Sequence, residues 1–110
     1  MVKKKIDWLK IIRDKAKKKI LFSYHATVQM NLEDRLITTG EVREVISKGK
    51  LIESRLNDPR GKTFLLNGKT KVGRYLHIVC SPKENFLIVV TTYVPNQTEW
   101  INNFSIRIKS

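Results

Sequence analysis

The hydrophobic pattern of this 110-residue chain changes its period once, near Lys50. Before that point apolar residues recur every three to four positions, the spacing that places them on one side of a helix. After it they alternate with polar residues or run continuously, as in strands that are half or fully buried. This single switch predicts one α+β domain over residues 1–110, in which helices come first and an antiparallel sheet follows.

The N-terminal segment, residues 1–19, is predicted to form a basic amphipathic helix. Its apolar positions make one stripe, and Trp8 within the segment needs burial, so we expect the helix to dock on the rest of the domain. Docking leaves its lysines on the outer side, where they can face a polyanion. An acidic membrane surface is the alternative ligand for such a helix.

Residues 20–49 are predicted to form a pair of helices. Ser23 is a suitable N-cap for the first. Thr38 or Thr39 caps the second, and Glu41 stands three positions beyond Thr38 in a capping-box arrangement.

Residues 50–94 are predicted to form a four-stranded antiparallel meander, because the connections between the apolar runs are short and rich in turn residues. The N-terminal helices are expected to pack on this sheet. Residues 95–110 form a C-terminal tail, in which "NQTEWINNF" suggests a closing helical turn. The expected strands cover residues 50–56, 62–67, 73–81 and 86–94.

A tight loop between the last two strands predicts their register. Loops of two or four residues both give partner numbers that sum to 167, so that Arg74 lies opposite Tyr93 and His77 lies opposite Val90. In this register Arg74 and Tyr93 share one face of the sheet, and His77 lies on the other.

The formal charge of the chain is +12, from 22 basic and 10 acidic residues. Residues 1–19 alone carry nine basic residues and two acidic ones, a net charge of +7, and the remainder carries +5. Such a chain attracts polyanions, of which nucleic acid is the commonest. Solubility or a hot growth environment is the alternative explanation of the high lysine content.

Other classes of protein are disfavoured by what the sequence contains. No apolar run approaches the roughly 20 residues of a membrane span, and the start lacks the pattern of a signal peptide, so a cytoplasmic location is expected. Cys80, the single cysteine, lies within an apolar strand and is expected to be a buried hydrophobe. Two histidines and one cysteine at scattered positions are too few for a zinc site, and we expect no metal and no cofactor.

The chemistry-bearing residues form a metal-free set. His25 and His77 are the two histidines, and histidine titrates closest to neutral pH. Each also has a structural interpretation, His25 as a group that hydrogen-bonds locally at a helix start and His77 as a half-buried strand residue. Arg35 could bind substrate or tie down a helix end, and the hydroxyl of Tyr93 could reach a groove.

Three stretches, "SYHATVQMNLEDRLITTGEV", "GRYLHIVCS" and "IVVTTYVPNQTEWINNF", resemble in order and spacing a family of small prokaryotic domains of unknown function related to the RelE and ParE toxins. The resemblance covers about residues 20–104. It implies a RelE-like fold, with helices on one face of a twisted antiparallel sheet and a concave basic surface on the other. By motif position it implies site roles for His25, Arg35, His77 and Tyr93.

The leading hypothesis is a toxin-like, metal-independent endoribonuclease of a toxin–antitoxin system, with His77, His25, Tyr93 and Arg35 as catalytic candidates. Its alternative is a non-catalytic module on the same fold that binds nucleic acid or the ribosome; a gyrase-type inhibitor or a protein-interaction role comes after these. Expected partners are RNA or the ribosome and a small acidic antitoxin. The sequence predicts no oligomeric state. The residues expected to grip nucleic acid are Arg74, Lys71, Lys62, Arg60, Lys3, Lys4 and Lys5.

Overall fold

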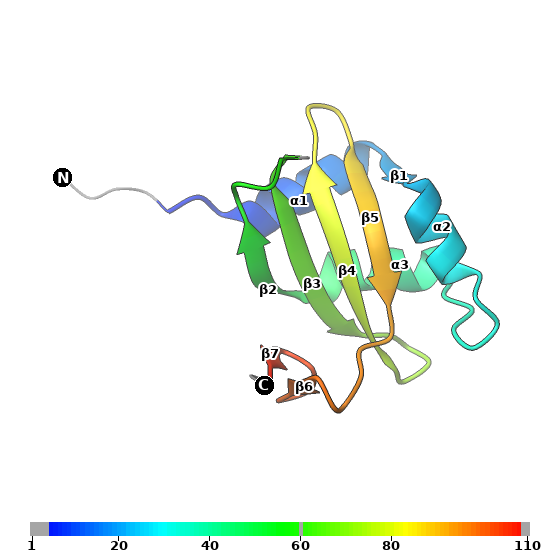
Figure 1. The fold of residues 1–110 in the computed structure, drawn as a ribbon. Helices are drawn as coiled ribbons and strands as arrows, with labels where there is room; N and C mark the ends of the chain where they lie inside the picture. The colour runs from blue at the N-terminus through cyan, green and yellow to red at the C-terminus, as the bar shows by residue number, and fades with distance from the viewer. Residues whose placement is uncertain (1–4, 60, 109–110) are drawn as a thin grey trace.

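The computed structural model of the protein describes residues 5–59 and 61–108. A five-stranded sheet has helices α1 (Trp8–Lys18) and α3 (Thr39–Lys48) behind it (Figure 1). Helix α2 (Tyr24–Met30) packs beside β5 at one side of the sheet. In chain order the strands of the sheet are β1 (Ile20–Phe22), β2 (Lys50–Arg55), β3 (Thr63–Lys69), β4 (Tyr75–Pro82) and β5 (Leu87–Tyr93).

Each helix begins where a side chain satisfies its first free N–H groups. Asp7 caps α1 by accepting from the N–H of Lys10 at 3.1 Å. Ser23 caps α2 as predicted. Thr38, not Thr39, caps α3, and Glu41 completes the predicted capping box.

The hydrophobic core lies between the sheet and the helices α1 and α3. Ile12 of α1 and Val45 of α3 are buried there against Leu66 and Ile78 of the sheet. Gly49, just after α3, lets that helix end close to β3: a Cβ at this position would lie 2.5 Å from the carbonyl oxygen of Val45. One hydrophobic cluster thus joins the elements on this side of the sheet.

The four-stranded antiparallel prediction is wrong, because the sheet has five strands and is mixed. The strand order is β1-β5-β4-β3-β2, and β1 pairs with β5 in parallel. Residues 20–22, predicted as part of a helical pair, form this fifth strand. Three residues are too few to show a period of two, so the pattern did not indicate a strand here.

The predicted register of β4 and β5 is also wrong. His77 pairs with Tyr93, not with Val90, and Val79 pairs with Thr91. The register then shifts, so that Cys80 pairs with Val89 and β5 carries one extra residue. This β-bulge moves Tyr93 onto the same face as His77, because one added residue reverses the alternation of side chains.

The C-terminal tail is not a closing helical turn. After β5 the chain crosses in front of the sheet and forms a small antiparallel hairpin from β6 (Trp100–Ile101) and β7 (Ile106–Arg107) (Figure 1). We call residues 95–108 the C-terminal strap. Among the described residues, none of the helices is long and apolar enough to cross a bilayer.

Candidate nucleic-acid-binding groove

The face of the sheet that α1 and α3 leave uncovered carries a mixture of polar and apolar side chains. Its composition follows from the strand pairing, because directly paired residues project to the same face. One row across the central strands consists of Asn67, His77 and Tyr93. Parallel to it runs a row with Leu65, Val79 and Thr91 at its centre.

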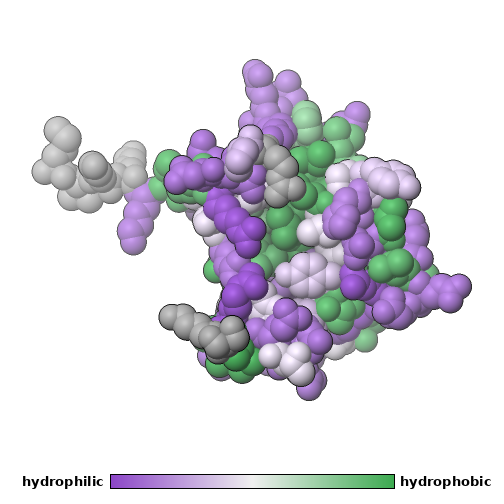
Figure 2. All heavy atoms as spheres, viewed as in Figure 1, coloured by the Kyte–Doolittle hydropathy of each residue, from purple (hydrophilic) through white to green (hydrophobic). Residues whose placement is uncertain are grey.

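Two adjoining hollows follow this face. The upper one, of about 330 Å³, is lined by Ser23, His25, Thr63, Ser81, Lys83, Ile88 and Val90. The lower one, of about 60 Å³, is lined by Glu53, Arg55, Thr63, Phe64, Leu65, Val79, Tyr93 and Arg107. Thr63 lines both, so we treat them together as the sheet groove. Figure 2 shows hydrophobic atoms of the sheet between hydrophilic side chains on either side.

The β-bulge helps to place His25 at the upper end of the groove. The backbone N–H of Ser23 donates to the carbonyl of Val89 at 3.0 Å, and its hydroxyl donates to the carbonyl of the extra residue, Val90, at 2.7 Å. Because Ser23 also caps α2, these bonds fix the start of that helix beside β5. His25, in the first turn, is exposed and lines the upper hollow.

His77 lies beneath the C-terminal strap and is fully buried, with no exposed surface. Its Nε2 lies 2.7 Å from the carbonyl oxygen of Phe104, and its Nδ1 lies 3.2 Å from the hydroxyl of Tyr93. Since a carbonyl only accepts, Nε2 carries the proton and Nδ1 accepts from Tyr93. Trp100 packs edge-on against the imidazole, with ring centroids 4.4 Å apart.

This environment keeps His77 neutral. Burial lowers the pKa of the imidazole, and the nearby carbonyl of Phe104 and carboxylate of Glu53 offset this only in part. Both ring nitrogens are engaged, so His77 has no site from which to accept a proton from a ligand while the strap is in place. The wet cleft that the sequence suggested for this histidine is therefore closed in this structure.

Tyr93 lies between the buried imidazole of His77 and the lower hollow of the sheet groove. It is half-buried, its ring lies edge-on to His77 with centroids 5.3 Å apart, and it also lines the lower hollow. Burial raises the pKa of its phenol, which favours the neutral form that donates to His77.

Arg74 lies outside the groove, immediately before β4. Its Nε and Nη2 donate to the two carboxylate oxygens of Glu41 at 2.8 and 2.7 Å, and its Nη1 donates to the carbonyl of Arg35 at 2.6 Å. The guanidinium hydrogen bond lowers the pKa of Glu41. Arg74 therefore acts here as a clamp between β4, α3 and the loop before α3.

The remaining predicted residues are scattered. Arg35 donates to the side chain of Gln29 at 2.7 Å and lines neither hollow. Lys71 is exposed, with its backbone N–H bonded to Glu44. Lys62 is exposed. It lies beside the groove, since its carbonyl accepts a hydrogen bond from the hydroxyl of Ser81 at 2.6 Å. Lys5 is exposed near the N-terminus, and Lys3, Lys4 and Arg60 lie outside the described residues.

Sequence reasoning missed Arg55 and Arg107, which flank the lower hollow. Both Nε and Nη2 of Arg107 donate to the carboxylate of Glu53, each at 3.1 Å, and its guanidinium lies 4.6 Å from the ring centroid of Trp100. Arg55 ends an alternating strand and could have been placed from its period. Arg107 could not, because the strap's course across the sheet depends on tertiary contacts.

Metal chemistry and thiol chemistry receive no support from the described residues. Within them, no three His, Cys, Asp or Glu side chains are grouped so as to hold a metal ion. Cys80 is fully buried on the core side of β4, and burial raises the pKa of its thiol to about 12. A thiol in that state is not a nucleophile at neutral pH.

Comparison with known proteins gives one match. A protein-family model described as Domain of unknown function (DUF4258) matches residues 22–94, which is more than half of the chain. No curated protein and no solved structure matches. The match does not link the chain to the RelE and ParE toxins, and that relationship stays a prediction.

Proposed function

We propose that this chain, which belongs to the family described as Domain of unknown function (DUF4258), binds single-stranded RNA in its sheet groove. The proposal is carried by the composition of the groove, an apolar floor with cationic side chains at its margins. Glu53 also lines the lower hollow, but its carboxylate is paired with Arg107. Ile88, Val90 and Val79 supply apolar lining, while Lys83 and Arg55 bring positive charge to its two hollows. The net charge of +12 adds a long-range attraction for any polyanion.

An apolar floor favours a single strand over a duplex. In a duplex the bases are paired and stacked inside, and only phosphates and groove edges meet the protein. A single strand can turn its bases onto apolar or aromatic side chains while its phosphates meet the cations. The upper hollow, about 330 Å³ in volume, offers room for a base beside the exposed imidazole of His25.

Hydroxyl groups in the groove favour RNA over DNA. Ser81 is 2 % exposed and donates its hydroxyl proton to the carbonyl of Lys62, so towards a ligand in the upper hollow its oxygen acts as an acceptor, the partner that a ribose 2′-hydroxyl needs. Thr63 is 3 % exposed and its hydroxyl donates to the carboxylate of Asp58 at 3.5 Å, so it adds a second, equally enclosed acceptor. The 2′-hydroxyl is the group by which proteins distinguish the two nucleic acids.

The test compares two arginines on opposite faces of the domain. Arg55→Gln removes a charge from the groove, and Arg43→Gln removes the same charge from α3, behind the sheet. With a labelled 12-nucleotide RNA in an anisotropy titration, we expect Arg55→Gln to weaken binding by about threefold to tenfold and to reduce the salt slope by about 0.7. Arg43→Gln should stay within about twofold of wild type.

An equal loss of RNA affinity in Arg55→Gln and Arg43→Gln would show that the sheet groove is not the binding site. Equal affinity for single-stranded RNA and a duplex of the same length would overturn the choice of ligand. Affinity that does not change between 50 and 200 mM salt would remove nucleic acid altogether, since phosphate contacts release counterions.

Cleavage of RNA is a second candidate function, favoured by the position of His25. Its exposed imidazole shares the upper hollow with Lys83 and two serine hydroxyls. An imidazole can take the proton of a 2′-hydroxyl as its oxygen bonds to the adjacent phosphorus, and a cationic ammonium can stabilise the phosphorane. The bond from phosphorus to the 5′-oxygen then breaks, and the imidazolium or a water molecule returns a proton to that oxygen. Incubation with RNA in the presence of chelator should then give defined cuts that His25→Ala slows at least a hundredfold. Binding without cuts by wild type would reject this candidate and leave the binding module.

A further inference from the structure

The C-terminal strap covers polar side chains that are suited to binding a ligand. Asn67, His77 and Tyr93 form one row across β3, β4 and β5. Of these, His77 is fully buried and Asn67 is 6 % exposed. Burying polar groups costs free energy unless each finds a partner, and apolar side chains would hold a strap in place at lower cost.

The partners of two of these side chains are main-chain carbonyls of the strap. His77 donates to the carbonyl of Phe104 at 2.7 Å, and the side-chain amide of Asn67 donates to the carbonyl of Asn103 at 2.9 Å. The Oδ1 atom of Asn67 is buried with no hydrogen-bond partner. The row is therefore incompletely satisfied when the strap is closed, as expected of groups that also serve another ligand.

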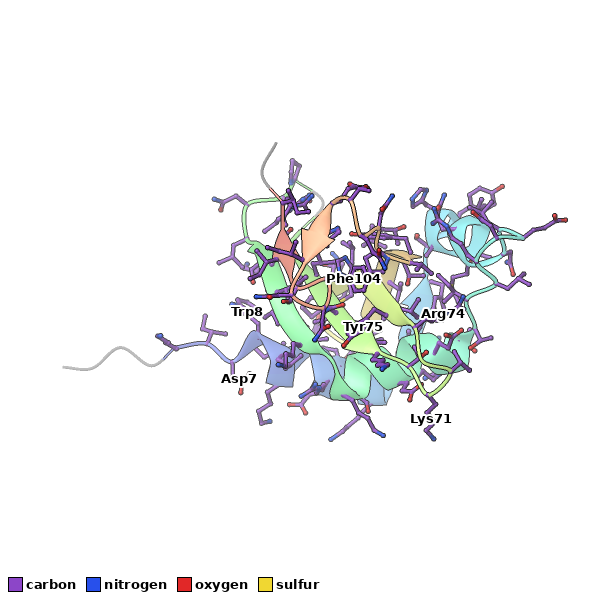
Figure 3. All side chains as sticks on the ribbon, turned by 90° about the horizontal axis from the view of Figure 1, so that it is seen from below. Asp7, Trp8, Lys71, Arg74, Tyr75 and Phe104 are labelled. Carbon is purple, nitrogen blue, oxygen red and sulfur yellow. The ribbon has the colours of Figure 1, made fainter. Side chains whose placement is uncertain are left out.

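The strap is strained at the point where it is anchored. Asn102, Asn103 and Phe104 have φ angles of 52°, 56° and 66°, the left-handed region that residues with a Cβ rarely adopt in succession. Phe104 packs its ring against that of Tyr75, with centroids 5.3 Å apart, and Figure 3 shows it on the side of the sheet away from α3. The strained backbone of this turn therefore favours release of the strap. The ring packing of Phe104 and the hydrogen bonds from His77 and Asn67 hold the strap in place.

The family match separates the strap from the residues that it covers. Residues 22–94 include the whole row, and the strap begins after the match ends. The lower hollow of the sheet groove lies between the matched sheet and the strap, since Tyr93 of the sheet and Arg107 of the strap both line it. Without the strap, the row would extend the groove past Tyr93.

We propose that the C-terminal strap is an autoinhibitory lid, which occupies the lower end of the RNA groove and lifts as a unit to admit single-stranded RNA to Asn67, His77 and Tyr93. This inference rests on the proposed RNA binding. Because only the open state offers the whole groove, the apparent affinity for RNA scales with the fraction of molecules whose strap is open.

The first experiment detects the opening without RNA. Diethyl pyrocarbonate modifies accessible neutral imidazoles, so in the intact 110-residue chain His25 should react fast and His77 only when the strap lifts. Cys80, three residues along β4 but on the core side, reports global unfolding through its reaction with a thiol reagent. Each rate is divided by its value in the urea-unfolded chain.

We expect the normalised rate of His77 to exceed that of Cys80 by at least tenfold. Equal normalised rates would mean that His77 is exposed only by global unfolding, and the lid would be rejected.

The second experiment shifts the opening in both directions. Asn103→Gly keeps the carbonyl that Asn67 binds but removes the Cβ from a left-handed residue, so it should favour the closed strap. Trp100→Ala removes the ring that packs on His77 and should favour the open strap. We expect RNA affinity to fall by about threefold in the first variant and to rise in the second, in each case by the same factor as the His77 modification rate.

The outcomes separate the two proposals. RNA binding by wild type that neither variant changes would overturn the lid and leave the proposed function intact. No RNA binding by wild type or by the open variant would overturn the proposed function, and the lid's role with it. A closed variant that binds RNA more tightly than wild type would also reject the lid.

Discussion

The hydrogen bonds of His77 predict a large loss of stability when this side chain becomes apolar. In His77→Leu the half-buried carbonyl of Phe104 loses its donor and faces an apolar side chain, while the half-buried hydroxyl of Tyr93 can turn to solvent. A carbonyl left without its donor costs about 1–3 kcal/mol. Leucine fills much of the same volume, so we expect the total loss of stability to stay at about 1–3 kcal/mol.

Urea unfolding at pH 7, followed by far-ultraviolet circular dichroism, measures this loss. With a urea dependence of about 2 kcal/mol per molar for a small domain, the midpoint should fall by about 0.5–1.5 M. His25→Leu is the matched control, because the same substitution at an exposed position should change stability by less than about 0.5 kcal/mol. A loss below about 0.5 kcal/mol in His77→Leu would refute the argument that His77 anchors the strap.

The same pair of proteins gives a test with pH. The ordinary pKa of the imidazole is 6.5, and burial lowers the pKa of His77 in the folded protein. Below pH 6.5 the unfolded chain therefore binds a proton that the folded chain does not. Neutral His77 therefore stabilises the wild-type protein fully above pH 6.5. This stabilisation is lost as the pH falls towards the pKa of His77 in the folded protein, by at most about 1.4 kcal/mol per pH unit.

His77→Leu lacks this contribution, so the stability difference between the two proteins should shrink as pH falls from 6.5 to 5. His25 is present in both and cancels. A difference that stays constant over this window would show that His77 titrates alike in the folded and unfolded chains.

Three further predictions concern the scaffold. Arg74→Gln should cost about 1–2 kcal/mol in urea unfolding, because the carboxylate of Glu41 loses its paired donors at a partly exposed site; an unchanged midpoint would contradict the clamp. Gly49→Ala should cost about 1–3 kcal/mol, since its Cβ would lie 2.5 and 2.7 Å from two carbonyl oxygens. Gly40→Ala should instead stabilise the protein by about 0.5–1 kcal/mol, because this helical position is exposed and a Cβ there would make only an ordinary contact, 3.8 Å from Oγ1 of Thr38; changes of the same sign would refute the packing argument. Cys80 should not react with a thiol reagent at pH 8 until the protein unfolds, because burial raises its pKa to about 12; fast reaction of the native protein would show that the core face of β4 is open.

Local structure was predicted well where its cause is local. Ser23 caps α2, and the Thr38 and Glu41 capping box starts α3, because a cap depends on residues three positions apart. The central strands were predicted because their apolar alternation extends over six to eight residues. A three-residue strand such as β1 has no such signal, and it forms only because β5 offers it a partner.

Only part of the candidate site was predicted, because the sequence pattern does not report contacts between distant segments. His25 and Tyr93 line the sheet groove, but the residue expected to be central, His77, lies beneath a strap that was predicted to be a helical turn. The contacts of Phe104 and Trp100 with His77 join positions more than 20 residues apart, and no pattern of composition or spacing reports on them.

By itself the sequence determined the α+β class, the caps of α2 and α3, the strong positive charge and the core positions of the central strands, because all of these follow from neighbouring residues and their period. The tertiary structure alone decided which face each polar side chain occupies. One extra residue in β5 placed Tyr93 beside His77, and a clamp to Glu41 took Arg74 out of the groove. Whether a polar side chain meets water or is covered depends on which distant segment packs over it, and only the folded chain brings those segments together.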